Sequence, residues 1–506
     1  MRTSRCILYL FIACLCGIVS AAPRLQPEHL QCEYAVDPVG VQTEQPLLSW
    51  TLQASSPGQR QTGYQILVAG SPDLLAQGKA DLWNSGQVLS DQSVHIPYAG
   101  VKLSSRQRCY WCVRVWDKNK KPSPWSAPAY WEMALLQPQE WQAHWIGSGP
   151  AREPRPAGGF FKSVQEEKSL PDTVQVDGRS TLLRKTFTIN RSIKRARLYV
   201  TGLGYYEAFC NGQRIGDHVL APAKSNYRRW VLYDVYDITS ALQQGDNAIG
   251  LMLGNGWFNP YKKWWQPYRM QWFGSKRAIV QLCIDYTDNT SQTIISDSSW
   301  KTSPGPVQFS CIYDGELYDA TLEIPGWCHA DFDDAGWHQA RHVEPPGGEL
   351  ICTPMPSIKV VERITPLRRL QPRAGVYIFD MGQNFTGWVR LTCHGRRGQK
   401  ITLRYAEDLY ADGTLDVTSN EKARAIDTYI MNGNDVEIYE PHFTFHGFQY
   451  VEISGLTYPP PLQDVAGCVV HSACPPTGSF QCDNDLVNRI HRATLWSQRS
   501  NLMGYP

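Results

Sequence analysis

Short runs of alternating apolar and polar residues, rich in β-branched and aromatic side chains, fill most of the chain after residue 23. Residues 64–69, 110–116, 196–201 and 388–392 are four such runs, and Gly, Pro, Asn and Asp gather between them. A period of two places successive side chains on opposite faces of a strand, and the intervening residues favour turns. The pattern therefore predicts a mostly β protein.

The predicted strands fall into three groups, which indicate three tandem β-sandwich domains. The first group covers residues 23–147, is rich in Trp, and is typical of a fibronectin type III-like or immunoglobulin-like sandwich. A stretch rich in Pro, Gly and charge at 148–180 is predicted to be a linker or long loop. The second and third groups cover residues 181–350 and 354–474.

Only the end of the chain, residues 475–506, changes to a helical period. Between residues 484 and 502 apolar side chains recur three and four positions apart, and Asp483 is the predicted N-cap. The apolar positions are Leu486, Val487, Ile490, Ala493, Leu495 and Trp496. One amphipathic helix has nothing of its own to pack against, so we expect it to be the first helix of a truncated helical domain.

The first 22 residues have the features of a secretory signal peptide. Arg2 and Arg5 precede an apolar run at 6–19, and small residues follow at 20–22. The run is shorter than the about 20 residues that span a bilayer, and no later stretch is long enough, so no transmembrane segment is predicted. The sequence predicts an exported protein. Lipoprotein anchoring at Cys14, the last residue of a loose lipid-attachment motif, is the alternative to plain secretion.

The net charge and the aromatic content of the chain limit the classes of ligand that it is expected to bind. Without Arg2 and Arg5, the 49 basic side chains become 47, which equals the 47 acidic ones, so charge gives no basis for binding nucleic acid or an anionic membrane. The 18 Trp and 25 Tyr supply ring faces that suit both β-cores and sugars.

The cysteines are predicted to be structural. Twelve remain after the signal segment, too few for a disulfide scaffold. Cys109 and Cys112 have the spacing of a C-x-x-C motif, but in a strand they point to opposite faces, and no second Cys or His pair stands at zinc spacing.

Motifs in a fixed order connect the three sandwiches to one family. They are PLLSW at 46–50, WNSG at 83–86, NGQRIGD at 211–217, LGNGW at 253–257, IYDGELYDA at 312–320, FDMGQNFTGW at 379–388 and FTFHGFQYV at 443–451. Together they resemble the bacterial α-L-rhamnosidases of glycoside hydrolase family 78. The resemblance implies a jelly-roll, galactose-binding-like second sandwich, a concanavalin-like third one, and then a six-hairpin α/α catalytic toroid.

The resemblance also implies where the chemistry lies. Members of the family hydrolyse terminal α-L-rhamnosides by inversion, and their general acid and base come from the toroid. The stretch equivalent to the end of this chain leads into the acid-bearing segment, so both groups are expected beyond Pro506. No residue of the chain is therefore assigned a catalytic role, and no cofactor is required.

A candidate substrate site lies in the second sandwich, because family members with a rhamnose-binding module carry related motifs there. Its residues are Asn211, Asp217, Tyr227, Trp230, Asn255 and Trp257. Aromatic faces can stack on a sugar and amides can bond its hydroxyls. Some of these modules use calcium, which prefers oxygen ligands; here Cys210 stands where sugar-binding members tend to have an acidic or amide ligand, so the metal ligands stay unassigned. Packing and turn formation are the alternative roles.

Two acidic clusters are better explained as structural. Asp314, Glu316 and Asp319 are the densest, but alternation puts the first two on one strand face, too crowded for the water that inversion needs. Asp380, Gln383 and Asn384 lie in a Gly-containing turn, where such side chains bond their own backbone; lining the mouth of the toroid is the alternative.

Two further features concern the surface. Arg404 and Glu407 are expected to form a surface ion pair. The segment 258–273 interleaves aromatic and basic side chains, and it suits a glycan platform or a loop that packs on the toroid better than a nucleic-acid platform.

Two functions follow. The first is the N-terminal portion of an exported α-L-rhamnosidase, which acts on L-rhamnose-containing glycans or rhamnosides and whose toroid packs on the β-domains. The alternative is a stand-alone, non-catalytic rhamnose-binding β-protein from a truncated gene. A different sugar specificity within the same architecture also stays open.

Overall fold

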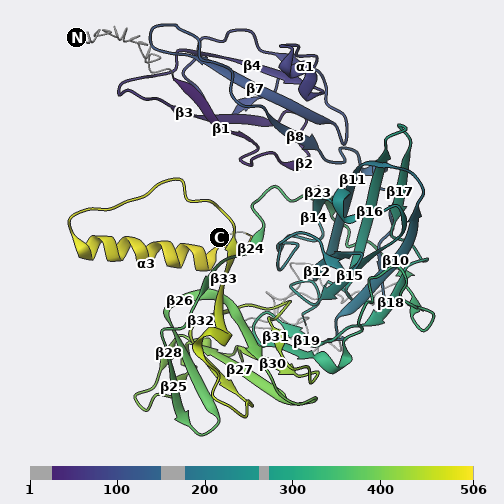
Figure 1. Cartoon of the computed structure of the whole chain (residues 1–506), viewed down its shortest axis with the longest axis vertical. Coiled ribbons are helices and arrows are strands. Elements are labelled where there is room, and N and C mark those ends of the chain that lie inside the picture. The colour runs from purple at the N-terminus through teal and green to yellow at the C-terminus, as the bar shows by residue number, and fades with distance from the viewer. Residues whose placement is uncertain (1–24, 150–176, 261–272, 505–506) are drawn as a thin grey trace, which may run out of the picture. The chain divides into compact units, whose positions relative to one another are not determined.

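The computed structural model describes residues 25–149, 177–260 and 273–504 (Figure 1). The predicted signal segment with Cys14, most of the predicted linker at 148–180 and the basic-aromatic residues 261–272 lie outside the described residues. The chain divides into two compact units, one up to Met133 and one from Ala134. Both are built mainly from strands, as the alternating pattern predicts.

The smaller unit is a two-sheet sandwich with tryptophans between its sheets. Trp50, Trp111 and Trp131 are at most 2% exposed. One sheet has the order β1 (Gln26–Cys32), β3 (Leu47–Gln53), β6 (Ile96–Pro97), and the other β2 (Val39–Val41), β8 (Ala129–Met133), β7 (Arg108–Trp116), β4 (Gly63–Ala69), β5 (Trp83–Asn84). A short helix, α1 (Pro72–Ala76), begins after Ser71, whose hydroxyl accepts the amide of Leu74.

The C-x-x-C cysteines lie within β7 and are buried. Burial raises the pKa of both Cys109 and Cys112 to about 12, so neither thiol is poised to react as a thiolate. Among the residues that the structure describes, no cysteine forms a disulfide. Across the described ranges, no three His, Cys, Asp or Glu side chains gather as metal ligands would.

The larger unit begins with a second sandwich, whose core includes Trp300, Leu198 and Ile249. One sheet has the order β13 (Gln213–Arg214), β12 (Tyr205–Cys210), β15 (Gly245–Gly254), β10 (Thr181–Ile189), β18 (Lys301–Pro304), β21 (His338–Gln339). The other has the order β22 (Arg341–His342), β9 (Ile146–Gly147), β16 (Arg277–Tyr286), β11 (Ile193–Leu203), β14 (Trp230–Asp237), β23 (Glu349–Cys352), with β17 (Ser291–Ile295) beside β16. Because β9 pairs with β16 and β22, residues 134–147 lie in the larger unit.

A third group of strands forms the largest sheet. Its order is β19 (Val307–Cys311), β20 (Gly315–Asp319), β30 (Ile426–Ile430), β27 (Lys400–Ala406), β32 (His446–Ser454), β26 (Val376–Cys393), β33 (Val465–Ser472), β24 (Ile358–Ile364). β25 (Arg368–Arg373) and β31 (Glu437–Tyr439) also pair with β26, and β28 (Asp408–Leu409) and β29 (Leu415–Asp416) form a small hairpin. The hairpin β19–β20 lies in sequence among the strands of the second sandwich, yet β20 pairs in parallel with β30.

The predicted terminal helix is present as α3 (Asp485–Asn501), but its N-cap is Asn484 and not Asp483. The side chain of Asn484 accepts the amide of Val487, which Asp483 is one residue too early to do. The C-terminal end of α3, yellow in Figure 1, is fixed on β26 and β33: the Thr386 hydroxyl donates to the carbonyl of Ser500, and Ser472 donates its amide to the carbonyl of Leu502.

No residue of α3 is fully buried. Leu486 and Ile490 are 61% and 57% exposed, and Leu495 is 41% exposed, so the apolar face of the helix is largely uncovered. Among the described residues, no helix is both long and apolar enough to cross a membrane.

Gly387 occupies a position in β26 where a side chain has no room, because β26 has β32 on one side and β33 on the other. A Cβ at this position would lie 1.8 Å from the carbonyl oxygen of Cys468. We expect Gly387→Ala to lower the free energy of unfolding of the larger unit by roughly 2 kcal/mol, since an overfilled core forces the backbone to shift. Urea unfolding measures the effect. Gly336→Ala, where no atom lies within 4 Å, is the control, and equal stability of the two variants would contradict the prediction.

Candidate functional site

The structure scatters most of the predicted sugar-binding residues. Asn211 forms the turn between β12 and β13 with a φ of 49°. Its amide nitrogen donates to the carbonyl of Ala241 (3.0 Å) and to Oδ1 of Asn247 (2.9 Å), and its Oδ1 accepts the amide of Ala248 (2.8 Å). The side chain therefore holds its own turn together.

Asn255 and Tyr227 are also enclosed. The Asn255 amide donates to the carbonyls of Gly178 (3.3 Å) and Ser310 (2.9 Å), and its Oδ1 accepts from the Lys276 ammonium (3.1 Å). Burial lowers the pKa of Lys276 to about 8. Tyr227, 1% exposed, packs edge-on against the rings of Phe258 and Phe273, 5.2 and 5.1 Å away.

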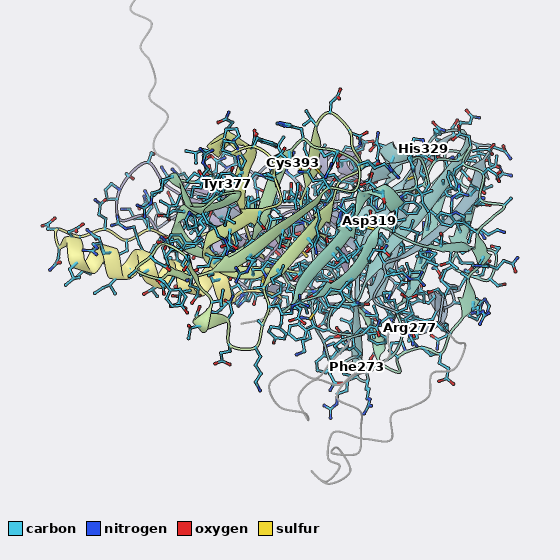
Figure 2. The ribbon with its side chains drawn as sticks, turned by 90° about the horizontal axis from the view of Figure 1, so that it is seen from below. Phe273, Arg277, Asp319, His329, Tyr377 and Cys393 are labelled. Atoms are coloured by element: carbon cyan, nitrogen blue, oxygen red, sulfur yellow. The ribbon has the colours of Figure 1, made fainter. Side chains whose placement is uncertain are left out.

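The same edge of the second sandwich carries Arg277, whose guanidinium lies 5.2 Å from the Phe258 ring. Figure 2 shows Phe273 and Arg277 close together there. Arg277 Nε also donates to the carbonyl of Ser275 (3.1 Å). This edge is thus a packed aromatic and cationic cluster.

Asp217 and Trp230 are the exposed members of the candidate set. Asp217 is 69% exposed and pairs with Lys359 at 2.9 Å, and Trp230 is 40% exposed at the start of β14. Near Asn211, the side-chain oxygen accepts the amide of Ala248, and the preceding residue, Cys210, is a buried thiol and not one of the oxygen ligands that calcium prefers.

Trp257 is different, because it lines a cavity of about 180 Å³. This volume is well above the roughly 10–15 Å³ that one water molecule needs. The lining is mainly apolar and aromatic and comes from the second sandwich, the third sheet and the end of α3: Tyr205, Leu220, Ala223, Lys224, Trp257, Ile358, Phe445, Asn501 and Met503. Among the residues that the structure describes, no carboxyl group lines this cavity. The described lining can contact a ligand but supplies neither a general acid nor a general base.

The cavity has one cation. The Lys224 ammonium lies 4.2 Å from the centre of the Trp257 ring, within the range of a cation–π contact. The indole is held in turn by Tyr313, edge-on at 5.9 Å. Burial lowers the pKa of Lys224. Sequence analysis identifies Trp257 but misses Lys224, Phe445 and Asn501. These residues come from segments more than 30 positions apart, and the motif that contains Phe445, FTFHGFQYV, does not single it out as a ligand contact.

A smaller cavity of about 20 Å³ lies beside the first and shares Leu220, Ala223 and Ile358 with it. The His218 imidazole bridges Tyr236 and Ser357 there: Nδ1 lies 2.9 Å from the Tyr236 hydroxyl and Nε2 lies 2.8 Å from Ser357 Oγ. This chain of hydrogen bonds links the second sandwich to the segment that leads into β24.

Asp314 and Glu316 are buried, and they and Asp319 accept hydrogen bonds from the backbone. Glu316 accepts the amides of His442 (3.1 Å) and Phe443 (3.0 Å), and burial raises its pKa to about 7. Asp314 accepts the amide of Arg424 at 3.2 Å, and Asp319 caps a short 3₁₀ turn that follows β20. These contacts match the structural interpretation of the cluster.

The second acidic segment differs from the prediction. The expected turn around Asp380, Gln383 and Asn384 is an irregularity within the single long strand β26, where the pairing with β32 shifts register between Asp380 and Phe385. Gly382 has a φ of 72° there, and Asp380 accepts its amide at 2.9 Å. A left-handed glycine fits a bulge as well as a turn, so the sequence does not distinguish the two.

The predicted ion pair between Arg404 and Glu407 is wrong. Arg404 pairs with Glu452 at 2.9 Å, and Glu407 accepts from the side-chain amide of Asn384 at 3.0 Å. Arg404 and Glu452 face each other directly across β27 and β32, a register that the local sequence does not reveal.

The domains of this chain match models of known protein domains. Four models of bacterial α-L-rhamnosidase domains match the chain in order: the Rha78A-like N-terminal immunoglobulin domain at 27–137, the α-L-rhamnosidase N-terminal domain at 191–362, the concanavalin-like domain at 370–471 and the six-hairpin glycosidase domain at 475–506. The chain belongs to the bacterial α-L-rhamnosidase family. The recognition of that family from its motifs is thereby confirmed.

Individual members of the α-L-rhamnosidase family are similar over nearly the whole chain. An α-L-rhamnosidase of Formosa agariphila is 36% identical over 481 residues, which cover 93% of this chain and 50% of that protein. The structure of an α-L-rhamnosidase from Dictyoglumus thermophilum, 38% identical, superimposes with a TM-score of 0.84 and covers 94% of this chain and 52% of that one. An α-L-rhamnosidase of Streptomyces avermitilis, solved in complex with L-rhamnose, is 28% identical with a TM-score of 0.87, covering 96% of this chain and 61% of that one. The chain thus spans about half the length of its relatives.

Proposed function

We propose that the chain is the β-domain portion of an α-L-rhamnosidase that removes terminal L-rhamnose from glycans or rhamnosides with inversion. The observation that carries the proposal is the uncovered apolar face of α3, in the segment that matches the six-hairpin glycosidase model. Soluble folded proteins normally cover an apolar helix face of this kind, and further helices of a six-hairpin domain would cover it.

The chemistry itself needs groups that the described cavity lacks. Inversion requires two carboxyl groups roughly 6.5–9.5 Å apart, one to protonate the leaving oxygen and one to activate a water molecule. Because no carboxyl group of the described residues lines the Trp257 cavity, we assign the acid and the base to the six-hairpin domain. The β-domains then fix the start of that domain through Thr386 and Ser472.

The proposal is tested with a protein that continues through a complete six-hairpin domain. We expect it to hydrolyse an aryl α-L-rhamnoside, with β-L-rhamnose as the first product seen by NMR, while the 506-residue chain is inactive. A well-folded extended protein without activity would contradict the proposal, and α-L-rhamnose as first product would contradict inversion.

A second candidate is a stand-alone rhamnose-binding protein, which the Trp257 cavity favours because an aromatic-lined cavity suits a sugar. It predicts binding of L-rhamnose to the 506-residue chain without hydrolysis. Titration calorimetry with and without calcium distinguishes this candidate; absence of heat in both titrations contradicts it. For either function we propose export, on the basis of residues 1–22.

A further inference from the structure

Lys224 is a partly buried cation without an anionic partner among the residues the structure describes. Its ammonium contacts the Trp257 ring at 4.2 Å, and no carboxylate of the described residues lies within ion-pair distance. Two other lysines of the larger unit have a carboxylate partner: Lys185 pairs with Asp297 at 3.3 Å and Lys359 with Asp217 at 2.9 Å. Withdrawing a charge from water without a counter-charge is costly. The Lys224 ammonium therefore favours an anionic ligand in this cavity.

The rest of the lining restricts the kind of anion. Tyr205, Trp257 and Phe445 provide aromatic surface, and Asn501, whose nitrogen donates to the carbonyl of Ser497 at 2.8 Å, keeps its side-chain oxygen as an acceptor. One ammonium matches a single negative charge. A phosphate dianion is usually held by several cations or by a guanidinium fork, and no arginine of the described residues lines this cavity.

We propose that the Lys224–Trp257 cavity binds the carboxylate of a uronic acid, so that the glycan recognised by this protein is an acidic one. The carboxylate pairs with the Lys224 ammonium, the C–H face of the sugar ring packs on the aromatic lining, and a hydroxyl donates to Asn501. That the ligand is a glycan rests on the proposed function; the negative charge follows from Lys224 alone.

The test measures binding of sodium D-glucuronate and D-galacturonate to the 506-residue chain by saturation-transfer NMR and calorimetry. We expect millimolar or tighter affinity that falls as ionic strength rises. The neutral parent sugars, D-glucose and D-galactose, are expected to bind at least about tenfold more weakly, because they lack the charged hydrogen bond.

Lys224→Gln and Lys224→Met are expected to weaken uronate binding about tenfold or more. Lys400→Gln, which removes one charge at an exposed position of β27, is the matched control and should bind as the unmodified chain does. Circular dichroism checks that each variant is folded. Absence of uronate binding, equal binding of the neutral sugars, or unchanged binding in both Lys224 variants would overturn the inference.

The two proposals fail separately, because uronate binding needs no hydrolysis. An inactive extended protein combined with Lys224-dependent uronate binding overturns the proposed function alone. An active extended protein whose β-domains do not bind uronate overturns the acidic-glycan inference alone.

Discussion

Replacing Asp427 with alanine is expected to lower the free energy of unfolding of the larger unit by about 3–5 kcal/mol. Asp427 is 0% exposed and is the common acceptor of three groups. It accepts the amide of Glu316 (2.9 Å) and the hydroxyl of Tyr405 (2.8 Å), and it lies 3.1 Å from Nε2 of His446. Alanine would leave these groups buried without a partner, which costs more than the hydrogen bonds themselves contribute.

Urea unfolding followed by circular dichroism, fitted with separate transitions for the two units, measures the loss. Asp412→Ala is the control: Asp412 is exposed in a turn and accepts the amide of Thr414, so its loss should cost less than about 1 kcal/mol. If the two alanine variants were equally stable, the buried carboxylate would not have the role assigned to it.

The second large effect is a loss of stability at alkaline pH that depends on His442. Its Nδ1 lies 3.1 Å from Glu207 of β12, and its backbone amide donates to Glu316. Burial opposes the charge on this imidazole, but the carboxylates of Glu207 and Glu316 outweigh that effect and raise the pKa of His442 from 6.5 to about 9. Arg214, 3.4 Å from Glu207, acts in the opposite direction without cancelling the rise.

The direction in which the free energy of unfolding changes with pH follows from proton binding. Between the unfolded pKa of 6.5 and the folded value of about 9, the folded protein keeps a proton that the unfolded chain releases, so stability falls as pH rises. Glu316, whose pKa burial raises from 4.5 to about 7, acts in the same direction at lower pH. Between pH 7 and 9 we expect the larger unit to lose roughly 2 kcal/mol, allowing for partial exposure of the imidazole.

Urea unfolding across this pH range measures the loss in the unmodified chain and in His442→Gln, which removes the titrating group and should flatten the dependence. His338→Gln, at an exposed position in β21, should keep the slope. If the free energy of unfolding of His442→Gln depended on pH as strongly as that of the unmodified chain, another group would be responsible for the pH dependence.

Much of the fold can be predicted from the sequence, because most strands are half-buried and show the period of two. The pattern predicts β4 and β7 of the smaller unit and β11 of the second sandwich, which contain the runs 64–69, 110–116 and 196–201. The pairing of β20 with β30 could not be predicted, since the two strands are separated by more than 100 residues and parallel pairing leaves no local turn signal. The N-cap of α3 was missed by one residue because Asp483 and Asn484 are both good caps.

The candidate site was predictable only in part. The motif LGNGW contains Trp257, and its aromatic side chain does line the cavity. The same motif contains Asn255, whose amide is used up inside the fold. Lys224 has no recognisable spacing to Trp257, and only the three-dimensional structure places its ammonium beside the Trp257 ring in the cavity lining.

The hairpin β19–β20 joins the second sandwich and the third sheet into one structural module. Its residues precede the end of the second sandwich in sequence, but β20 is a member of the third sheet, and Glu316 anchors the backbone at His442 and Phe443. We expect that exchanging one of these sandwiches for a homologue requires the hairpin and its acceptor strand to change together. For recombination, the two sandwiches are therefore expected to behave as one unit, whereas a crossover near Ala134 would separate the smaller unit without cutting this pairing.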